Sequence, residues 1–131
     1  MLMPLTPLTR ADCPCCGYPT LDQGADFEIC LLCDWEDDGQ GETDAAEVRG
    51  GPNGDYSLAE ARSNFARRLV MYREGHRRPI TPAQQQIKRE LMAAYDAWRD
   101  APADTRDALA AEALRLERMY RATSRLSLDD D

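Results

Sequence analysis

This chain of 131 residues has a single histidine, no long apolar run and no cysteine outside one short segment. The only histidine is His76, which excludes a histidine-based catalytic triad and a histidine-rich catalytic zinc site. Residues 1–10 contain Pro4 and Pro7 but no basic leader and no long apolar run. We therefore expect neither secretion nor membrane insertion, and a cytoplasmic location is the default.

All five cysteines lie between residues 13 and 33, and four of them form two Cys-x-x-Cys pairs that thirteen residues separate. Two such pairs suit a tetrahedral site in which each thiolate lies about 2.3 Å from one metal ion. In a reducing compartment, clustered cysteines favour a metal over disulfides or a redox dithiol, which are the alternatives. The sequence predicts one structural zinc ion. Its predicted ligands are Cys13, Cys16, Cys30 and Cys33.

The residues that follow each pair differ, and the fifth cysteine needs its own explanation. Gly17 follows Cys16 and tolerates the positive φ that such a turn tends to need. Asp34 follows Cys33, so we expect the second turn to be less regular. Cys15 adjoins Cys16, and two adjacent sulfurs do not easily share one tetrahedral ion. We expect a free thiol at Cys15, and a redox or metal-relay role is the alternative.

The segment between the pairs is typical of a short β-hairpin, with strands at 18–21 and 25–29 and a turn at 22–24. Phe27 and Ile29 would share a face of this hairpin and cover the metal site. Residues 12–56 are thus predicted to form a zinc ribbon with an acidic loop, after a flexible leader at residues 1–11.

Charge is distributed unevenly along the chain, whose formal net charge is −8. Between residues 34 and 60, nine carboxylates stand against Arg49 alone, whereas between 62 and 125 fourteen basic residues outnumber eight acidic ones. Either the two halves dock on each other, or the acidic loop meets a basic partner. The candidate partner-binding residues are Trp35, Glu36, Asp37 and Asp38. Trp35 is alternatively a core residue beneath the ribbon, which we favour.

Three amphipathic helices are predicted after the acidic loop, which makes the expected fold class α+β. Ser57 and Glu60 form a capping box at the start of the first helix, and Gly75 is its expected stop. Thr81 is the expected cap of the second helix. The predicted helices span 57–74, 82–100 and 103–123, within a helical segment 57–125 that an acidic tail at 126–131 follows. The expected inward residues of the last two are Ile87, Leu91, Ala94, Tyr95, Trp98, Leu109, Ala113, Leu116, Met119 and Tyr120.

Three blocks of this sequence, at residues 13–18, 30–40 and 49–54, together resemble the bacterial CPCC family of cysteine-rich proteins. The likeness continues to Phe65, and it covers residues 12–66, about two fifths of the chain. The resemblance implies a small bacterial protein with a zinc-binding ribbon, in which the four paired cysteines are the ligands. It implies no activity, and the helices beyond Phe65 fall outside it.

The function that these features favour is protein binding. Four thiolates leave no coordination position for water, so we expect no enzymatic activity and no catalytic residue. The hypothesis is a non-enzymatic module that binds another protein, and in its more specific form an immunity-type protein that neutralises a basic toxin. The competing hypothesis is a nucleic-acid-associated regulator, which the isoelectric point of about 4.6 disfavours. Its candidate residues are Arg67, Arg68, Arg73, Arg77 and Arg78.

Overall fold

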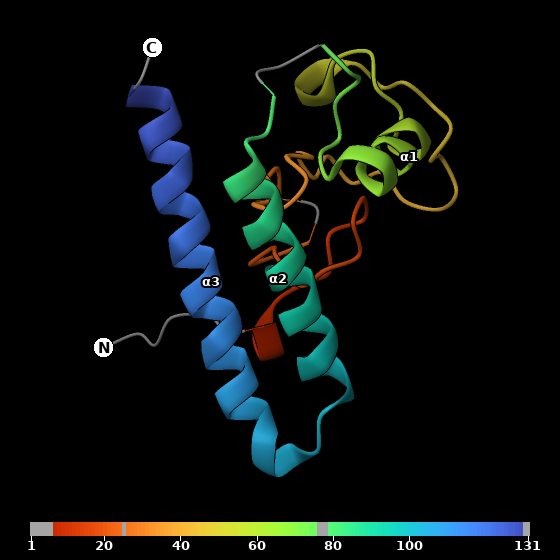
Figure 1. The fold of residues 1–131 in the computed structure, drawn as a ribbon. Helices are drawn as coiled ribbons and strands as arrows, with labels where there is room; N and C mark the ends of the chain where they lie inside the picture. The colour runs from red at the N-terminus through yellow and green to blue at the C-terminus, as the bar shows by residue number, and fades with distance from the viewer. Residues whose placement is uncertain (1–6, 25, 76–78, 130–131) are drawn as a thin grey trace. The chain divides into compact units, whose positions relative to one another are not determined.

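The computed structural model describes residues 7–24, 26–75 and 79–129, in two compact units. We call residues 9–78 the knuckle unit, because they contain both Cys-x-x-Cys turns, or knuckles. Residues 1–8 and 79–131 are the helical unit. Figure 1 shows the three α-helices, of which α1 belongs to the knuckle unit and α2 and α3 to the helical unit. The predictions for residues 1–6, for residues 76–78 and for the last two residues lie outside the described part.

The predicted β-hairpin is wrong, and so is the α+β fold class of a zinc ribbon followed by helices. The described ranges contain helices and no β-strand. The pairings found there are isolated antiparallel bridges between Ala11 and Leu21 and between Ile29 and Glu36. Each bridge closes the chain across one knuckle, instead of joining residues 18–21 to 25–29. The described part of the protein is therefore mostly helical.

The side chain of Glu28 gives a physical reason for the missing hairpin. Its carboxylate accepts hydrogen bonds from the backbone N–H groups of Asp22 and Gln23, at 2.8 and 2.6 Å. Phe27 has a φ of 57°, in the left-handed region that interrupts an extended strand. Backbone donors near the expected turn are therefore satisfied by a side chain rather than by an opposing strand.

The prediction that Phe27 and Ile29 cover the metal site is also wrong, because their exposed fractions are 58% and 64%. Buried apolar side chains from both sides of the second knuckle form the core instead. They are Leu21, Leu32, Trp35, Leu58, Ala61, Phe65 and Met71. Trp35 is fully buried, which confirms its interpretation as a core residue.

Helix α1 (Leu58–Arg68) begins where its capping signal predicts and ends earlier than expected. Ser57 is the N-cap, and its hydroxyl accepts a hydrogen bond from the N–H of Glu60 at 3.0 Å. The chain leaves the helix at Leu69, whose φ is 64°, six residues before the stop expected at Gly75. The early end brings Met71 to the second knuckle, where its N–H donates to the carbonyl of Cys33 at 2.8 Å.

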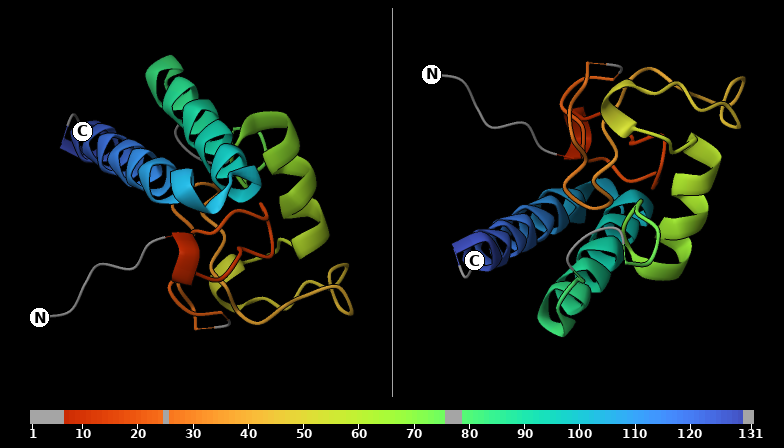
Figure 2. Two further views of the ribbon diagram at one scale, coloured as in Figure 1. Left: turned by 90° about the horizontal axis from the view of Figure 1, so that it is seen from below. Right: turned by 90° about the horizontal axis from the view of Figure 1, so that it is seen from above.

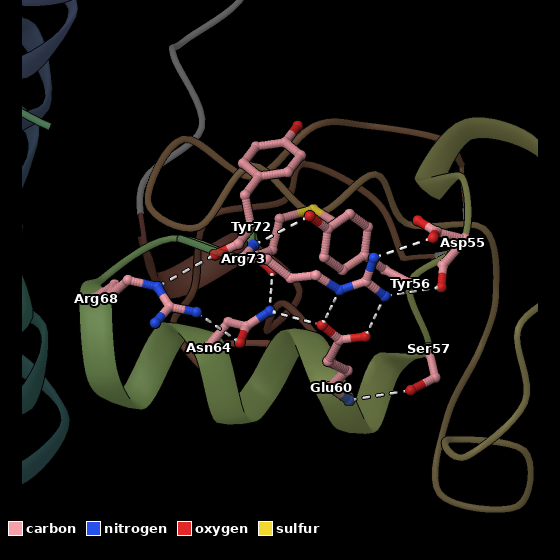
Figure 3. Close-up of polar contacts among 9 residues, drawn as sticks. Asp55, Tyr56, Ser57, Glu60, Asn64, Arg68, Tyr72 and Arg73 are labelled. Carbon is pink, nitrogen blue, oxygen red and sulfur yellow. Dashed lines mark hydrogen bonds and ion pairs between the residues drawn. The ribbon is translucent and has the colours of Figure 1, made fainter. Parts of the chain in front are cut away.

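Asn64 on α1 holds this returning segment in place (Figure 3). Its side-chain amide donates to the carbonyl of Met71 at 2.8 Å, and its side-chain oxygen accepts from Arg68 at 3.0 Å. Both Asn64 and Met71 are buried. Because a buried carbonyl without a partner is costly, this amide stabilises the segment that contacts the second knuckle.

The helical unit consists mainly of α2 (Pro82–Asp100) and α3 (Ala103–Asp129). The short 3-10 helix η1 (Pro7–Thr9) spans the boundary at which the chain passes from residue 8 of this unit into the knuckle unit. The two α-helices run antiparallel and side by side in Figure 1 and in both views of Figure 2. Thr81 is the N-cap of α2, as predicted, and it forms a complete capping box with Gln84. None of the described helices is long and apolar enough to cross a bilayer.

The apolar stripe of α2 is buried at every predicted position, whereas the stripe of α3 is less regular. Met119 on α3 is 40% exposed, and the pattern did not predict the buried Lys88 and Glu117. Glu117 accepts a hydrogen bond from the hydroxyl of Tyr95, and the ammonium of Lys88 lies 5.5 Å from the ring centre of Tyr120. Helix α3 also continues through Asp129, past the end predicted at residue 123 and into the predicted tail.

Substitution Asn64→Ala is expected to lower the free energy of unfolding by about 1–3 kcal/mol, because it leaves the buried carbonyl of Met71 without its partner. Urea denaturation monitored by circular dichroism measures this change. Ser63→Ala is the matched control, since Ser63 is the exposed neighbour on the same helix. Equal stabilities of the two variants would contradict the role of Asn64.

Candidate metal centre

Four of the five cysteines meet at one point in the knuckle unit. The Sγ atoms of Cys13, Cys16, Cys30 and Cys33 all lie within 4.8 Å of one another. The Sγ atoms of Cys13 and Cys33 are 3.6 Å apart, and so are those of Cys16 and Cys30. Four sulfurs that each lie about 2.3 Å from one zinc ion are about 3.8 Å apart at the corners of a tetrahedron. The cluster therefore has the donors and the spacing to bind one metal ion.

The two knuckles make the same backbone turn. The N–H of Gly17 donates to the carbonyl of Cys13 at 2.8 Å, and the N–H of Asp34 donates to that of Cys30 at 2.9 Å. Gly17 has a φ of 81° and Asp34 a φ of 73°. The second turn is thus not less regular than the first, since aspartate visits the left-handed region more readily than most residues with a side chain.

Backbone and hydroxyl groups surround the sulfurs of the second knuckle. The N–H of Leu32 lies 3.3 Å from the Sγ of Cys30, and the N–H of Trp35 lies 3.5 Å from the Sγ of Cys33. The hydroxyl of Thr20 is 3.0 Å from the Sγ of Cys30. Such contacts orient thiolate ligands and reduce their charge. The sequence did not identify Thr20, because its distance from Cys30 along the chain conceals the contact.

Helix α1 and the segment after it touch both knuckles, which the sequence also did not predict. The Nε of Arg62 donates to the carbonyl of Pro14 in the first knuckle at 2.9 Å. Met71 donates to Cys33 in the second, as described above. The local sequence carries no signal for either contact, although Arg62 lies within the residues that resemble the CPCC family. The helix and the segment after it thus connect the two turns through backbone carbonyls, in addition to the cluster of sulfurs.

Burial and hydrogen bonds within the cluster shift the pKa values of the thiols of Cys16, Cys30 and Cys33. Burial by itself raises the pKa of the Cys30 thiol, but hydrogen bonds from the other three thiols and from Thr20 bring it well below its ordinary value. Burial, together with hydrogen bonds within the cluster, raises the pKa of Cys33, and the hydrogen bond to Cys13 raises the pKa of Cys16. A metal ion that binds all four sulfurs must therefore displace the protons that the cluster retains.

Cys15 stands outside the group of four sulfurs. Its side chain is buried, and its hydrogen bond to Cys33 is one of the contacts that raise the pKa of Cys33. All five cysteines are free of disulfides. Cys15 thus lies beside the candidate metal centre as a neighbour of one ligand.

Most of the predicted partner-binding residues build the loop rather than face outward. Trp35 and Asp37 are buried, and Glu36 and Asp38 are half-buried. The carboxylates of Asp37 and Asp38 accept hydrogen bonds from the N–H groups of Gly39 and Gln40. Within the described ranges the carboxylate of Glu36 makes no hydrogen bond and no ion pair. Of these four residues, Glu36 is therefore the best placed to meet a partner.

Much of the acidic charge between residues 34 and 60 is neutralised inside the knuckle unit. The ion pairs are Arg49 with Asp44, Arg62 with Glu42 at 2.5 Å, and Arg73 with Asp55 at 3.0 Å and with Glu60 at 2.6 Å. Hydrogen bonds from Arg73 hold the pKa of Glu60 below its ordinary value. Because Arg62 and Arg73 come from the basic half of the sequence, contacts within this unit cancel part of the charge asymmetry.

Comparison with known proteins gives one family. Residues 11–86, more than half of the chain, match the family model described as cysteine-rich CPCC. The match extends past Phe65, where the resemblance read from the sequence ended, and includes all of α1 and the start of α2. No curated protein and no solved structure gives a significant match.

The left-handed turn at Gly17 leads to a test of the first knuckle. Gly17→Ala is expected to lower the free energy of unfolding by about 1–2 kcal/mol, because a side chain there strains the backbone although the space around it is open. Gly41→Ala is the matched control, since Gly41 also has open space but no positive φ. Chemical denaturation of both variants measures the effect, and a neutral Gly17→Ala would show that the turn does not need glycine.

Proposed function

We propose that this chain, which belongs to the cysteine-rich CPCC family, is a non-enzymatic zinc-binding module that binds another protein. The observation that supports the proposal most directly is the cluster of four sulfurs in the knuckle unit. The metal is then structural, and the surface that it stabilises is the functional part.

The donor set favours zinc over the hard cations. Four thiolates suit zinc or iron, whereas magnesium and calcium prefer oxygen ligands. Zinc bound by Cys13, Cys16, Cys30 and Cys33 would have a closed coordination shell, with no position for a reactive water. Such an ion supplies folding energy rather than catalysis, which favours a binding function.

An acidic protein surface suits a basic protein partner. Carboxylates that lack a cationic partner in the unit, such as Glu36, keep their negative charge available for association. Charge complementarity of this kind accelerates association and suppresses wrong partners. In its more specific form, the proposal is an immunity-type protein whose acidic face covers the basic active cleft of a toxin.

The nucleic-acid alternative has less support from the arginines that it needs. Arg73 pairs with Asp55 and Glu60, and Arg68 donates to Asn64 and to the carbonyl of Tyr72. Arg67 is exposed, and Arg77 and Arg78 lie outside the described residues. A guanidinium already held by carboxylates contributes little to binding phosphates. The other alternative, a redox or metal-relay role for Cys15, would require reagents to reach a buried thiol.

Protein purified without added metal is expected to contain about one zinc ion per chain, as elemental analysis measures. Cys33→Ser is expected to lose the ion, and the matched variant Cys15→Ser to retain it. Iron in place of zinc would change the proposed metal. The absence of any metal, with linked thiols seen by mass spectrometry, would overturn the metal centre altogether.

Affinity capture with the full chain from its native cells, after nuclease treatment, tests the binding function. The captured protein is then produced separately and mixed with the zinc-loaded chain, and sedimentation velocity is expected to show a complex of defined stoichiometry. Removal of zinc with a chelator is expected to abolish the complex, because the binding surface depends on the metal-stabilised fold. Salt-sensitive retention on DNA or RNA, without a protein partner, would contradict the proposal.

A further inference from the structure

One hollow on the knuckle unit combines apolar and acidic walls. It has a volume of about 550 Å³ and is partly open to solvent. Ile29 and Tyr72 supply apolar surface, and Asp34, Glu36 and Asp55 supply carboxylates. Tyr56 and Met71, both buried, also line it. A volume of this order accommodates two or three side chains of a peptide.

The walls of the hollow are held in place by hydrogen bonds. The side chain of Asn53 accepts from the N–H of Glu36 at 3.0 Å and donates to the carbonyl of the same residue at 2.7 Å. Elsewhere in the lining, the hydroxyl of Tyr56 accepts from the N–H of Arg73 at 3.0 Å. Met71 is tied to the second knuckle by its bond to Cys33. A site that exists before binding loses less entropy when a partner arrives.

Arg73 shows how this region binds a guanidinium group (Figure 3). Its guanidinium lies between Asp55 and Glu60, at 3.0 and 2.6 Å, and 4.4 Å from the ring centre of Tyr56. Carboxylates and a tyrosine ring together form the environment that suits arginine best. Because Asp55 and Tyr56 also line the hollow, the chain already uses this chemistry among its lining residues.

The lining also includes a carboxylate and an aromatic ring that Arg73 does not use, those of Glu36 and Tyr72. The carboxylate of Glu36 is half-buried and has no partner within the described ranges. Tyr72 packs edge to face on Tyr56, with ring centres 5.8 Å apart, and it also lines the hollow. Ile29, which pairs with Glu36 in a β-bridge, is 64% exposed and also lines the hollow, so its apolar surface lies open beside the carboxylate.

We propose that this hollow binds an arginine side chain, together with an adjacent apolar side chain, from a short segment of a protein partner. The guanidinium would pair with Glu36 beside the ring of Tyr72, and the apolar side chain would cover Ile29. This inference rests on the proposed protein-binding function and specifies the chemistry of the partner at this site.

Titration of the zinc-loaded, ¹⁵N-labelled chain with the peptide acetyl-Leu-Arg-Leu-amide tests the inference by NMR. We expect saturable shifts of the backbone amides of Glu36, Asp55 and Tyr72. The same peptide with citrulline in place of arginine has the same shape without the charge, and it is expected to bind about tenfold more weakly. Shifts that do not saturate, that lie elsewhere, or that are equal for both peptides would overturn the proposal.

Two pairs of variants separate the charge from the apolar contact. Glu36→Gln is expected to weaken binding of the arginine peptide about tenfold, whereas Glu47→Gln, at an exposed carboxylate outside the hollow, leaves it unchanged. Ile29→Ser is expected to weaken binding, whereas Val48→Ser, at a residue 56% exposed and outside the hollow, does not. Zinc content and the dispersion of the NMR spectrum show that each variant is folded. Equal affinities within both pairs would contradict the inference.

The captured partner distinguishes failure of this inference from failure of the proposed function. If that partner binds Glu36→Gln and Ile29→Ser as tightly as the unmodified chain, the hollow is not its site, although the binding function stands. If no protein partner forms a complex with the zinc-loaded chain, the proposed function itself fails.

Discussion

Four sulfur atoms, two from each knuckle, lie within 4.8 Å of one another, and the two knuckles meet at this cluster. One isolated β-bridge and a few backbone hydrogen bonds close each knuckle, and within the described residues no strand ladder connects the two. A metal ion at the centre of the sulfurs would replace the missing ladder with four strong bonds. In a unit of this size, the free energy of metal binding then becomes free energy of folding.

Helix α1 provides the second connection between the knuckles. Its Arg62 contacts the first turn, and the segment that follows it contacts the second. The helix can serve both turns because it ends early, at Arg68, and lets the chain return along its surface. Asn64 stabilises this return, so a polar residue buried on α1 supports the turn that contains two of the candidate metal ligands.

The ion pairs of this unit define which of its carboxylates and arginines are already paired within the chain. Arg49, Arg62 and Arg73 neutralise carboxylates that the sequence presents as one acidic run. The same pairs reduce the number of arginines available to a nucleic acid. What remains at the hollow is a carboxylate beside exposed apolar surface, a combination that suits a basic protein segment better than a phosphate backbone.

The sequence by itself determined the features whose chemistry is local. The spacing of Cys13, Cys16, Cys30 and Cys33 identified the cluster, since a Cys-x-x-Cys turn places both sulfurs on one side of a short loop. Ser57 and Thr81 marked helix starts because a capping side chain bonds to an N–H only three residues away. The blocks around the cysteines likewise indicated the family.

Only the tertiary structure decided how the knuckles close, where α1 ends and what lines the hollow. Glu28 replaced the expected hairpin by bonding to Asp22 and Gln23, and α1 ended early at a left-handed Leu69, which lets Met71 reach Cys33. The apolar pattern did not predict that Lys88 and Glu117 are buried, because Tyr120 and Tyr95, which contact them, each lie on the other helix. These outcomes depend on contacts between segments far apart along the chain, and periodicity or spacing within one segment carries no information about such contacts.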